Sequence, residues 1–219
     1  MRNKLVCIFA HPDDEAFEPA GTIALYSKTH DVYLLCATKG ESCGSKDTHI
    51  AQIREKELLD SANILGVKKV IFLGFKDGSL CNGIYYDIAA KVKAEIEKIK
   101  PEILLTFEPR GVSGHIDHIT ISMVTTYLFE HLSFVKTLLY YCHTEEHTKL
   151  EKKKMGDYFV YFPPGYAHNE IGKIVDITSV WDKKVSAIKS HKSQMKDGNF
   201  VLSVLTELPK KEYFLVLNK

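Results

Sequence analysis

Short apolar runs alternate with amphipathic segments over the first half of the chain, and this order constrains the fold more than any other feature. Two segments, 49–65 and 87–100, place apolar residues three and four positions apart, and Gly66 and Pro101 stand where such helices end. Four runs rich in β-branched and large apolar residues are expected to be buried strands: 5–10, 32–37, 70–73 and 103–107. Strands alternating with helices predict right-handed βαβ units and a mostly parallel sheet.

The rest of the chain continues this pattern less regularly. A helix is expected from His118 to about His131, and the charged, aperiodic segment 143–157 is expected to be an exposed loop or a short helix. Further strands are expected at 137–142, 158–162, 173–177 and 213–217, with a helix at about 180–190. The sequence therefore predicts an α/β fold, a Rossmann-like three-layer sandwich with helices on both faces of the sheet and a C-terminal extension of strands and a helix.

The chain length bounds the domain organisation. A chain of 219 residues fits a single domain, and no linker is visible. We expect one domain over 1–219, with the Rossmann-like core reaching to about residue 142. The extension from about 143 to 219 is expected to build one wall of the functional site.

Charge and cysteine content exclude several classes of partner. Lys and Arg number 29 against 28 Asp and Glu, so no broad field would attract nucleic acid or an anionic membrane. No run approaches the roughly 18 apolar residues of a membrane span, and the first apolar run is too short for a signal peptide. Five scattered cysteines without a C-x-x-C pair indicate a reducing compartment, and Cys7, Cys36 and Cys142 lie in apolar runs. A soluble, cytoplasmic protein is expected.

Polar clusters follow the first and fourth predicted strands. The first strand is followed by H-P-D-D-E at 11–15, and the fourth is followed by H-I-D-H at 115–118. In open parallel sheets, ligands bind beyond the carboxyl ends of the strands, where the strand order reverses. With a strand order of 3-2-1-4, the first and fourth strands flank that point and the two clusters face each other.

Two converging His and Asp clusters can supply three metal ligands and leave one coordination place for water. Such a metal lowers the pKa of water from about 15.7 to about 7 and polarises a carbonyl, as amide hydrolysis requires. Taken alone, His11-Pro12 would be a strand-ending turn with Asp14 as a helix cap, and His115 and His118 would be exposed polar residues. Their joint placement favours the metal site.

Nucleotide binding is the competing interpretation of a Rossmann-like sheet. It needs a G-x-G-x-x-G turn after the first strand, where this chain has carboxylates that would repel phosphate. The glycines at 40–44 have neither the spacing nor the position. A dinucleotide enzyme is therefore disfavoured.

At these clusters the sequence resembles the LmbE-like or PIG-L-like family of zinc-dependent N-acetylglucosaminyl deacetylases. The resemblance is based on A-H-P-D-D-E at 10–15 and H-x-D-H at 115–118, and is reinforced by segments that extend over most of the chain. Those segments are 38–41, Arg54, Glu57, 65–66, Ala187 and 191–194. It implies a hydrolase that removes the acetyl group from an N-acetylglucosamine-containing small molecule, giving amine and acetate.

The resemblance also implies a set of site residues. His11, Asp14 and His118 would ligate Zn²⁺, although Fe²⁺ or Co²⁺ also accept such ligands. Asp13 would be the general base, and His115, oriented by Asp117, would stabilise the oxyanion or protonate the leaving amine. Glu15 would hold the loop or a ligand. Sugar hydroxyls would be bound by Arg54 and Asp77.

Several alternatives stay open at this point. His191 and Gln194 either reach the site or fix the C-terminal segment against it, and Arg110 contacts either substrate or a neighbouring subunit. A metal- or sugar-binding protein without turnover, or a hydrolase of a non-sugar amide, are the alternative functions. The family implies a homo-oligomer, and the preferred substrate is a small soluble glycoside such as a precursor of a low-molecular-weight thiol.

Overall fold

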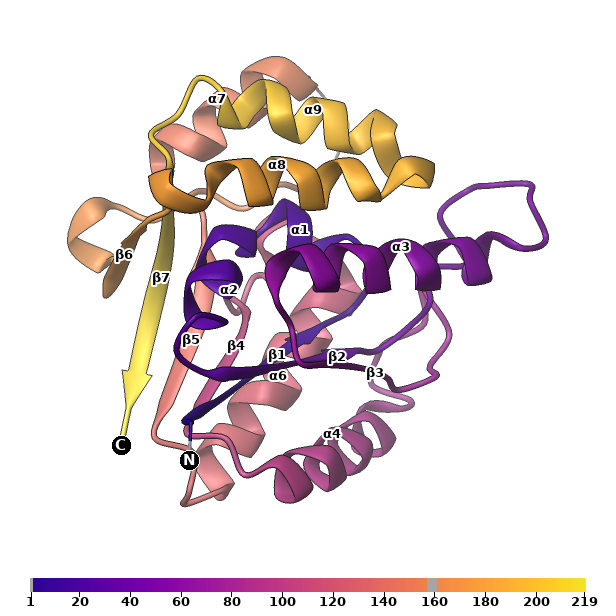
Figure 1. Cartoon of the computed structure of the whole chain (residues 1–219), viewed down its shortest axis with the longest axis vertical. Coiled ribbons are helices and arrows are strands. Elements are labelled where there is room, and N and C mark those ends of the chain that lie inside the picture. The colour runs from indigo at the N-terminus through magenta and orange to yellow at the C-terminus, as the bar shows by residue number, and fades with distance from the viewer. Residues whose placement is uncertain (1, 157–160) are drawn as a thin grey trace.

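The computed structural model, which describes residues 2–156 and 161–219, contains one mixed sheet with helices on both faces (Figure 1). Its strands within the described residues are β1 (Lys4–Phe9), β2 (Asp31–Cys36), β3 (Lys69–Phe72), β4 (Ile103–Phe107), β5 (Thr137–Cys142), β6 (Lys173–Asp176) and β7 (Lys211–Asn218). Their order is β3-β2-β1-β4-β5-β7-β6. Strands β1 to β5 are parallel, whereas β7 runs antiparallel to β5 and to β6. The predicted Rossmann-like α/β fold and its 3-2-1-4 strand order are confirmed.

The helices of the described residues form layers around this sheet. Their bounds are α1 (Asp14–Phe17), α2 (Ala20–Tyr26), α3 (Ile50–Leu65), α4 (Tyr85–Ile99), α5 (Gly111–Gly114), α6 (Ile116–His131), α7 (Glu145–Met155), α8 (Trp181–Ser190) and α9 (Met195–Leu205). Figure 1 shows α4 and α6 on one side of the sheet and α2, α3 and α8 on the other, with α7 and α9 beyond α8. Among the described residues, none of these helices has both the length and the apolar character needed to cross a bilayer.

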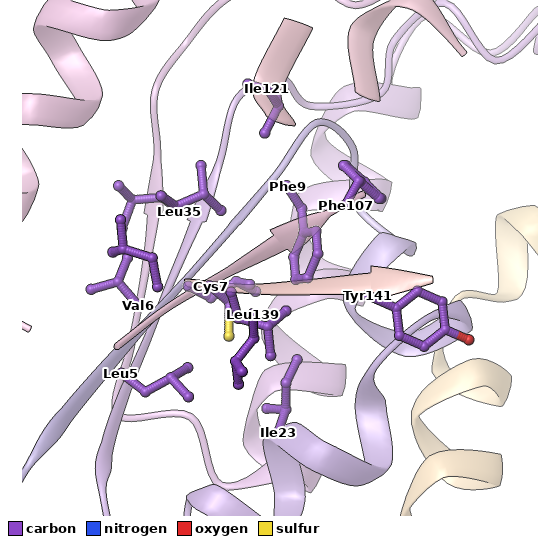
Figure 2. Close-up of a cluster of buried hydrophobic side chains, with 14 of the residues drawn as sticks. Leu5, Val6, Cys7, Phe9, Ile23, Leu35, Phe107, Ile121, Leu139 and Tyr141 are labelled. Carbon is purple, nitrogen blue, oxygen red and sulfur yellow. The ribbon is translucent and has the colours of Figure 1, made fainter. Parts of the chain in front are cut away.

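The core lies on both faces of the central strands. Residues 5–9 of β1 are at most 1% exposed, because a parallel sheet covered by helices buries both faces of its inner strands. Phe9 and Phe107 pack edge to face with ring centroids 5.2 Å apart, beside Leu139 and Tyr141 (Figure 2). The thiol of Cys7 is buried in this cluster, and burial raises its pKa. Cys36 and Cys142 are also buried, as expected.

Three parts of the chain differ from the sequence-based expectation. Segment 145–155 is helix α7, but it is not wholly exposed: His147, Thr148 and Glu151 form a buried face, and a polar buried face leaves no apolar periodicity. Of the strand expected at 158–162, residues 158–160 lie outside the described residues, and residues 161–162 are not in a strand. Helices α1, α2 and α9 were not predicted; the first two are only 4 and 7 residues long, and α9 contains Gly198.

A buried ion pair joins the C-terminal elements to the N-terminal half. The Lys184 ammonium of α8 contacts the Glu212 carboxylate of β7 at 2.8 Å, and both side chains are at most 2% exposed. The same carboxylate accepts the backbone N–H groups of Gly21 and Thr22 at the start of α2. Lys184 also donates to the carbonyl of Glu18. One pair of charges therefore connects α8, β7 and the segment that follows α1.

We predict that Lys184→Met destabilises the protein by about 3–5 kcal/mol, because it leaves the Glu212 charge buried without its partner. Urea unfolding followed by circular dichroism measures the free energy of unfolding. The matched control is Lys183→Met, which alters an exposed lysine of the same helix and should change stability by no more than about 0.5 kcal/mol. Equal effects of the two variants would contradict this account of the ion pair.

Candidate metal centre

Three side chains from distant parts of the chain converge beyond the carboxyl ends of β1 and β4. His11 and Asp14 follow β1, and His118 lies in the first turn of α6. His118 Nε2 is 3.3 Å from His11 Nδ1 and 3.3 Å from Asp14 Oδ1, and His11 Nδ1 is 3.8 Å from Asp14 Oδ2. The structure thus brings together the three residues that the sequence suggested as metal ligands.

The hydrogen-bond partners of the two imidazoles determine which nitrogen of each ring carries a proton. His118 Nδ1 lies 3.1 Å from the carbonyl of Gly111, an acceptor only, so His118 Nδ1 is protonated and Nε2 has a lone pair. His11 Nε2 faces Asp77 Oδ1 at 3.0 Å and Asp117 Oδ2 at 3.3 Å, so in a neutral ring its lone pair is on Nδ1. In that neutral form two lone pairs and a carboxylate oxygen face one another, an arrangement suited to binding a metal ion.

The spacing of these donor atoms fits a metal better than direct hydrogen bonds. Tetrahedral Zn²⁺ with ligands at 2.0–2.1 Å requires about 3.3–3.4 Å between neighbouring ligand atoms. His11 Nδ1 and Asp14 Oδ1 each lie 3.3 Å from His118 Nε2, and the ligand atoms of the three residues all lie within 4.8 Å of one another. The donor set of two imidazoles and one carboxylate therefore fits a divalent transition metal with further coordination places free.

Asp77 and Asp117 hold the far side of the His11 ring. Asp117 was expected to orient His115, but its carboxylate contacts His11 and accepts the backbone N–H groups of Gly78 and Leu80. Only the backbone N–H of Asp117 reaches His115, at Nδ1. Burial acts to lower the pKa of His11, but hydrogen bonds to Asp117 and Asp77 prevail and raise it to about 10. Both aspartates thus serve the metal centre through His11, an arrangement typical of metal-ligating histidines.

Asp14, unlike His11, is held in place by backbone N–H groups. Its Oδ2 accepts the N–H groups of Ala10 and His11 at 3.0 and 2.7 Å, which leaves Oδ1 directed at His118. Burial acts to raise the pKa of Asp14, but His118 and His11 hold it below its ordinary value. The carboxylate is therefore ionised, as a metal ligand must be.

Asp13 lies beside this group in a different environment. Its Oδ2 is 2.9 Å from the Arg54 guanidinium, which also donates to the carbonyls of Pro12 and Gly40. Burial raises the pKa of Asp13 to about 7 although Arg54 acts against the rise. Arg54 is only 3% exposed, so it binds the protein loop, and its expected contact with sugar hydroxyls remains a prediction. The same holds for Asp77, whose two oxygens contact His11 and the N–H of Ser42.

His115 stands at the edge of the group, with its ring centroid 4.9 Å from those of His11 and His118. Its Nδ1 accepts the backbone N–H of Asp117, so in the neutral ring the proton is on Nε2. Burial and the neighbouring rings of His118 and His11 lower the pKa of His115. A neutral His115 can therefore donate a hydrogen bond from Nε2.

The loops that present these side chains hold two residues in unusual backbone conformations. Asp13 has φ 118° and Val112 has φ 63°, both in the left-handed region that only glycine adopts freely. The Glu108 carboxylate stabilises the second turn by accepting the N–H groups of Arg110 and Val112 and the hydroxyl of Tyr166. Such conformations cost of order 1–3 kcal/mol each and gather at functional sites. The Arg110 guanidinium pairs with Glu108 and lies 4.1 Å from the centre of the Tyr166 ring.

The C-terminal segment is attached to the first of these loops. His191 is fully buried, and its Nε2 lies 2.7 Å from Glu15 Oε1, which also accepts the hydroxyl of Ser61. Glu15 Oε2 accepts the backbone N–H of Asp13. His191 therefore fixes the segment rather than reaching the cavity, and Glu15 has the loop-holding contacts expected for it. Gln194 does line the cavity.

A cavity of about 460 Å³ opens over the group. Its lining includes all of the residues expected at the site except Asp117, which lies behind His11. The sequence analysis missed four further charged or titratable groups of the lining: Glu18, His143, Glu151 and Asp197. The H-x₃-H-x₃-E spacing of 143, 147 and 151, which puts three polar residues on one helical face, is a signal that could have identified two of them.

Comparison with known proteins agrees with this geometry. A family model described as PIG-L: GlcNAc-PI de-N-acetylase matches residues 6–129, more than half of the chain. A probable N-acetyl-alpha-D-glucosaminyl L-malate deacetylase 2 from Bacillus cereus is 29% identical over 89% of this chain and 84% of its own length. A 1D-myo-inositol 2-acetamido-2-deoxy-alpha-D-glucopyranoside deacetylase from Mycobacteroides abscessus is 27% identical over 94% and 88%. Among solved structures, N,N'-diacetylchitobiose deacetylase from Pyrococcus horikoshii has a TM-score of 0.73 at 23% identity, covering 99% and 84%.

We predict that the protein binds one divalent ion per chain at this centre. His118→Ala should abolish stoichiometric uptake, and Asp117→Asn should weaken affinity by roughly 10- to 100-fold, because Asp117 orients a ligand without being one. Chelator competition on protein stripped of metal measures both effects. His131→Ala, which alters an exposed histidine at the other end of α6, is the control and should bind the ion normally. Normal uptake by His118→Ala would refute the assignment.

Proposed function

Because the chain belongs to the PIG-L family of de-N-acetylases, we propose that it hydrolyses the acetamide of an N-acetylglucosamine-containing small molecule, giving a free amine and acetate. One observation supports this above all: His11, Asp14 and His118 converge on a single position beside Asp13, at the floor of a cavity large enough for a sugar. A fold of this kind supports many reactions, so the argument depends on the site.

The proposed metal would be held by His11 Nδ1, Asp14 Oδ1 and His118 Nε2. When bound, a divalent ion supplies a Lewis acid for the acetamide carbonyl and lowers the pKa of a water molecule beside it. Zn²⁺ is the proposed ion, and Fe²⁺ or Co²⁺ would suit the same donors.

Asp13 is the proposed general base. Asp13 lies next to the proposed ligand Asp14. Arg54 holds Oδ2 of Asp13, which leaves Oδ1 to accept a proton from the attacking water. Its raised pKa of about 7 lets it take that proton and release it again near neutral pH. Arg54 keeps the carboxylate directed towards the cavity, a positioning role that is compatible with a contact to the sugar.

His115 is the proposed donor to the developing oxyanion. Its Nε2 proton is free because Nδ1 is occupied by the backbone N–H of Asp117. The neutral ring suits hydrogen-bond donation to a negative oxygen better than delivery of a full proton. The leaving amine would then receive the proton that Asp13 has taken.

The domain organisation of the protein is also a proposal. Residues 1–219 would form a single deacetylase domain whose C-terminal segment completes the wall of the cavity through α7 and α9, both of which contribute to its lining. Self-association and a cytoplasmic location, inferred from the family resemblance and the free cysteines, remain predictions.

We predict that Asp13→Asn keeps the metal but loses roughly 10²- to 10⁴-fold in kcat, the usual contribution of a general base. Asn is isosteric and can still accept a hydrogen bond from Arg54, so the loop should be preserved. Metal content and acetate release are measured on the same preparation. Asp14→Ala, by contrast, should lose the metal; equal metal loss in both variants would show that the two roles are wrongly assigned.

Binding without turnover, and hydrolysis of a non-sugar amide, are tested by one panel of substrates. Acetate release is measured from free N-acetylglucosamine, its glycosides and acetylated amino acids with the metal-loaded protein. We expect the glycosides to react fastest. Tight binding of a glycoside with no release would favour a binding protein, and faster reaction of acetylated amino acids would favour a different hydrolase.

A further inference from the structure

The cavity is also lined by carboxylates that the proposed metal centre does not use. Glu18 follows α1, Glu151 lies on α7 and Asp197 lies on α9, and all three line the cavity. A substrate whose acetamide reached the centre would place its remaining part in the same cavity as these acids.

The sum of charges around the cavity is negative. Six carboxylates line it, from Asp13, Asp14, Glu18, Asp77, Glu151 and Asp197, against the single guanidinium of Arg54 among the described residues. The carboxylates outnumber the cationic group, and the sum stays negative even with a divalent ion bound. An acidic cavity of this kind attracts cations and repels anions.

The one guanidinium is already committed to the protein. Arg54 donates to the carbonyls of Pro12 and Gly40 and pairs with Asp13. Recognition of a carboxylate or phosphate by arginine uses a pair of free, parallel N–H groups. Arg54 Nη2 already donates to both Pro12 and Asp13, so no parallel pair of N–H groups is free, although Nε has no partner among the described residues.

His143 neutralises only part of the negative charge of the carboxylates that line the cavity. Its Nδ1 lies 3.0 Å from Glu151 Oε2 and its Nε2 lies 3.3 Å from Glu18 Oε2. Both nitrogens face carboxylates, so the ring is an imidazolium, and the two acids acting against its burial raise its pKa to about 10. With that charge included, the sum is still negative.

The same histidine does not form a second metal site with His147. Their rings are stacked, with centroids 3.6 Å apart and planes at 14°. The lone pairs of nearly parallel rings run side by side, so a single ion cannot lie in the plane of both. The cluster of His143, His147 and Glu151 therefore contributes charge and hydrogen-bond acceptors rather than a metal.

Apolar side chains complete the lining of the cavity. Phe17, Met155, Phe162, Phe200 and Val201 line the cavity beside the acids. Aromatic faces and carboxylate acceptors together suit the C–H and O–H groups of a sugar or polyol.

We propose that the group joined to the acetamido sugar is uncharged or cationic, such as a polyol, a second sugar or an amino sugar, and that Glu18, Glu151 and Asp197 exclude an anionic group there. This inference depends on the proposed deacetylase function. Of the substrates named for the two relatives, this proposal favours the inositol glycoside over the malate glycoside.

The experiment compares two substrates of nearly the same shape, the malate glycoside of N-acetylglucosamine and its dimethyl ester. We expect kcat/KM to be roughly ten- to thirtyfold higher for the ester, as repulsion of one charge at about 8 Å predicts at an effective dielectric constant near 20. Raising the ionic strength should narrow the difference.

Single-residue variants test which carboxylates lower kcat/KM for the malate glycoside. Asp197→Asn removes an exposed carboxylate of the lining and should raise the ratio of kcat/KM for the malate glycoside to kcat/KM for the ester roughly threefold. Asp182→Asn, an exposed acid of α8 that is not part of the lining, is the control and should change neither value. Glu18→Gln tests a second carboxylate of the cavity lining in the same way.

Equal or higher kcat/KM for the malate glycoside than for its ester would overturn the proposal. Lys152 is the first cation to examine in that case, because its ammonium lies 5.8 Å from the centre of the Phe162 ring at the edge of the cavity. If Lys152→Ala then removes the preference for the anion, that lysine and not the acids determines specificity. Failure of the proposed function would look different, since no glycoside, charged or neutral, would release acetate.

Discussion

The convergence of two imidazole lone pairs and a carboxylate oxygen at one point is the constraint on which the site depends. Two of these atoms, His11 Nδ1 and Asp14 Oδ1, lie 3.3 Å from the third, His118 Nε2, and a positive charge among them, from a metal ion or a proton, relieves their repulsion. Asp77, Asp117 and the Gly111 carbonyl fix this arrangement by taking the protons of the two rings. The protein thus holds the outer contacts of a metal site in place by its own hydrogen bonds.

The sheet brings these donors together. β1 and β4 are adjacent and parallel, so the loops after them leave the same edge of the sheet although about a hundred residues separate them. Both loops contain residues with positive φ, at Asp13 and Val112, and buried carboxylates of Glu15 and Glu108 accept their backbone N–H groups. The backbone strain in these loops is therefore offset by hydrogen bonds that carboxylates outside the proposed ligand set accept.

Periodicity was enough to predict strands β1 to β5 and the crossover helices, because their buried faces are apolar, whereas the 3-2-1-4 strand order was an assumption based on open α/β sheets in general. It was not enough for α7, whose buried face is made of His147, Thr148 and Glu151, or for the short helices α1 and α2. The residues at the metal centre could be identified because they are contiguous in two motifs. The Asp117 contact with His11 and the outer carboxylates could not, since they depend on how loops and α9 pack across long sequence separations.

The contact between His191 and Glu15 has a consequence for how the protein is made. A ribosome produces the loop at 11–15 first, yet the partner that completes its hydrogen bonding is 176 residues downstream. Domains generally fold as units during or after synthesis. The loop at 11–15 therefore acquires its full set of hydrogen bonds only after residue 191 has been synthesised, and the arrangement proposed to bind the ion would be complete only then.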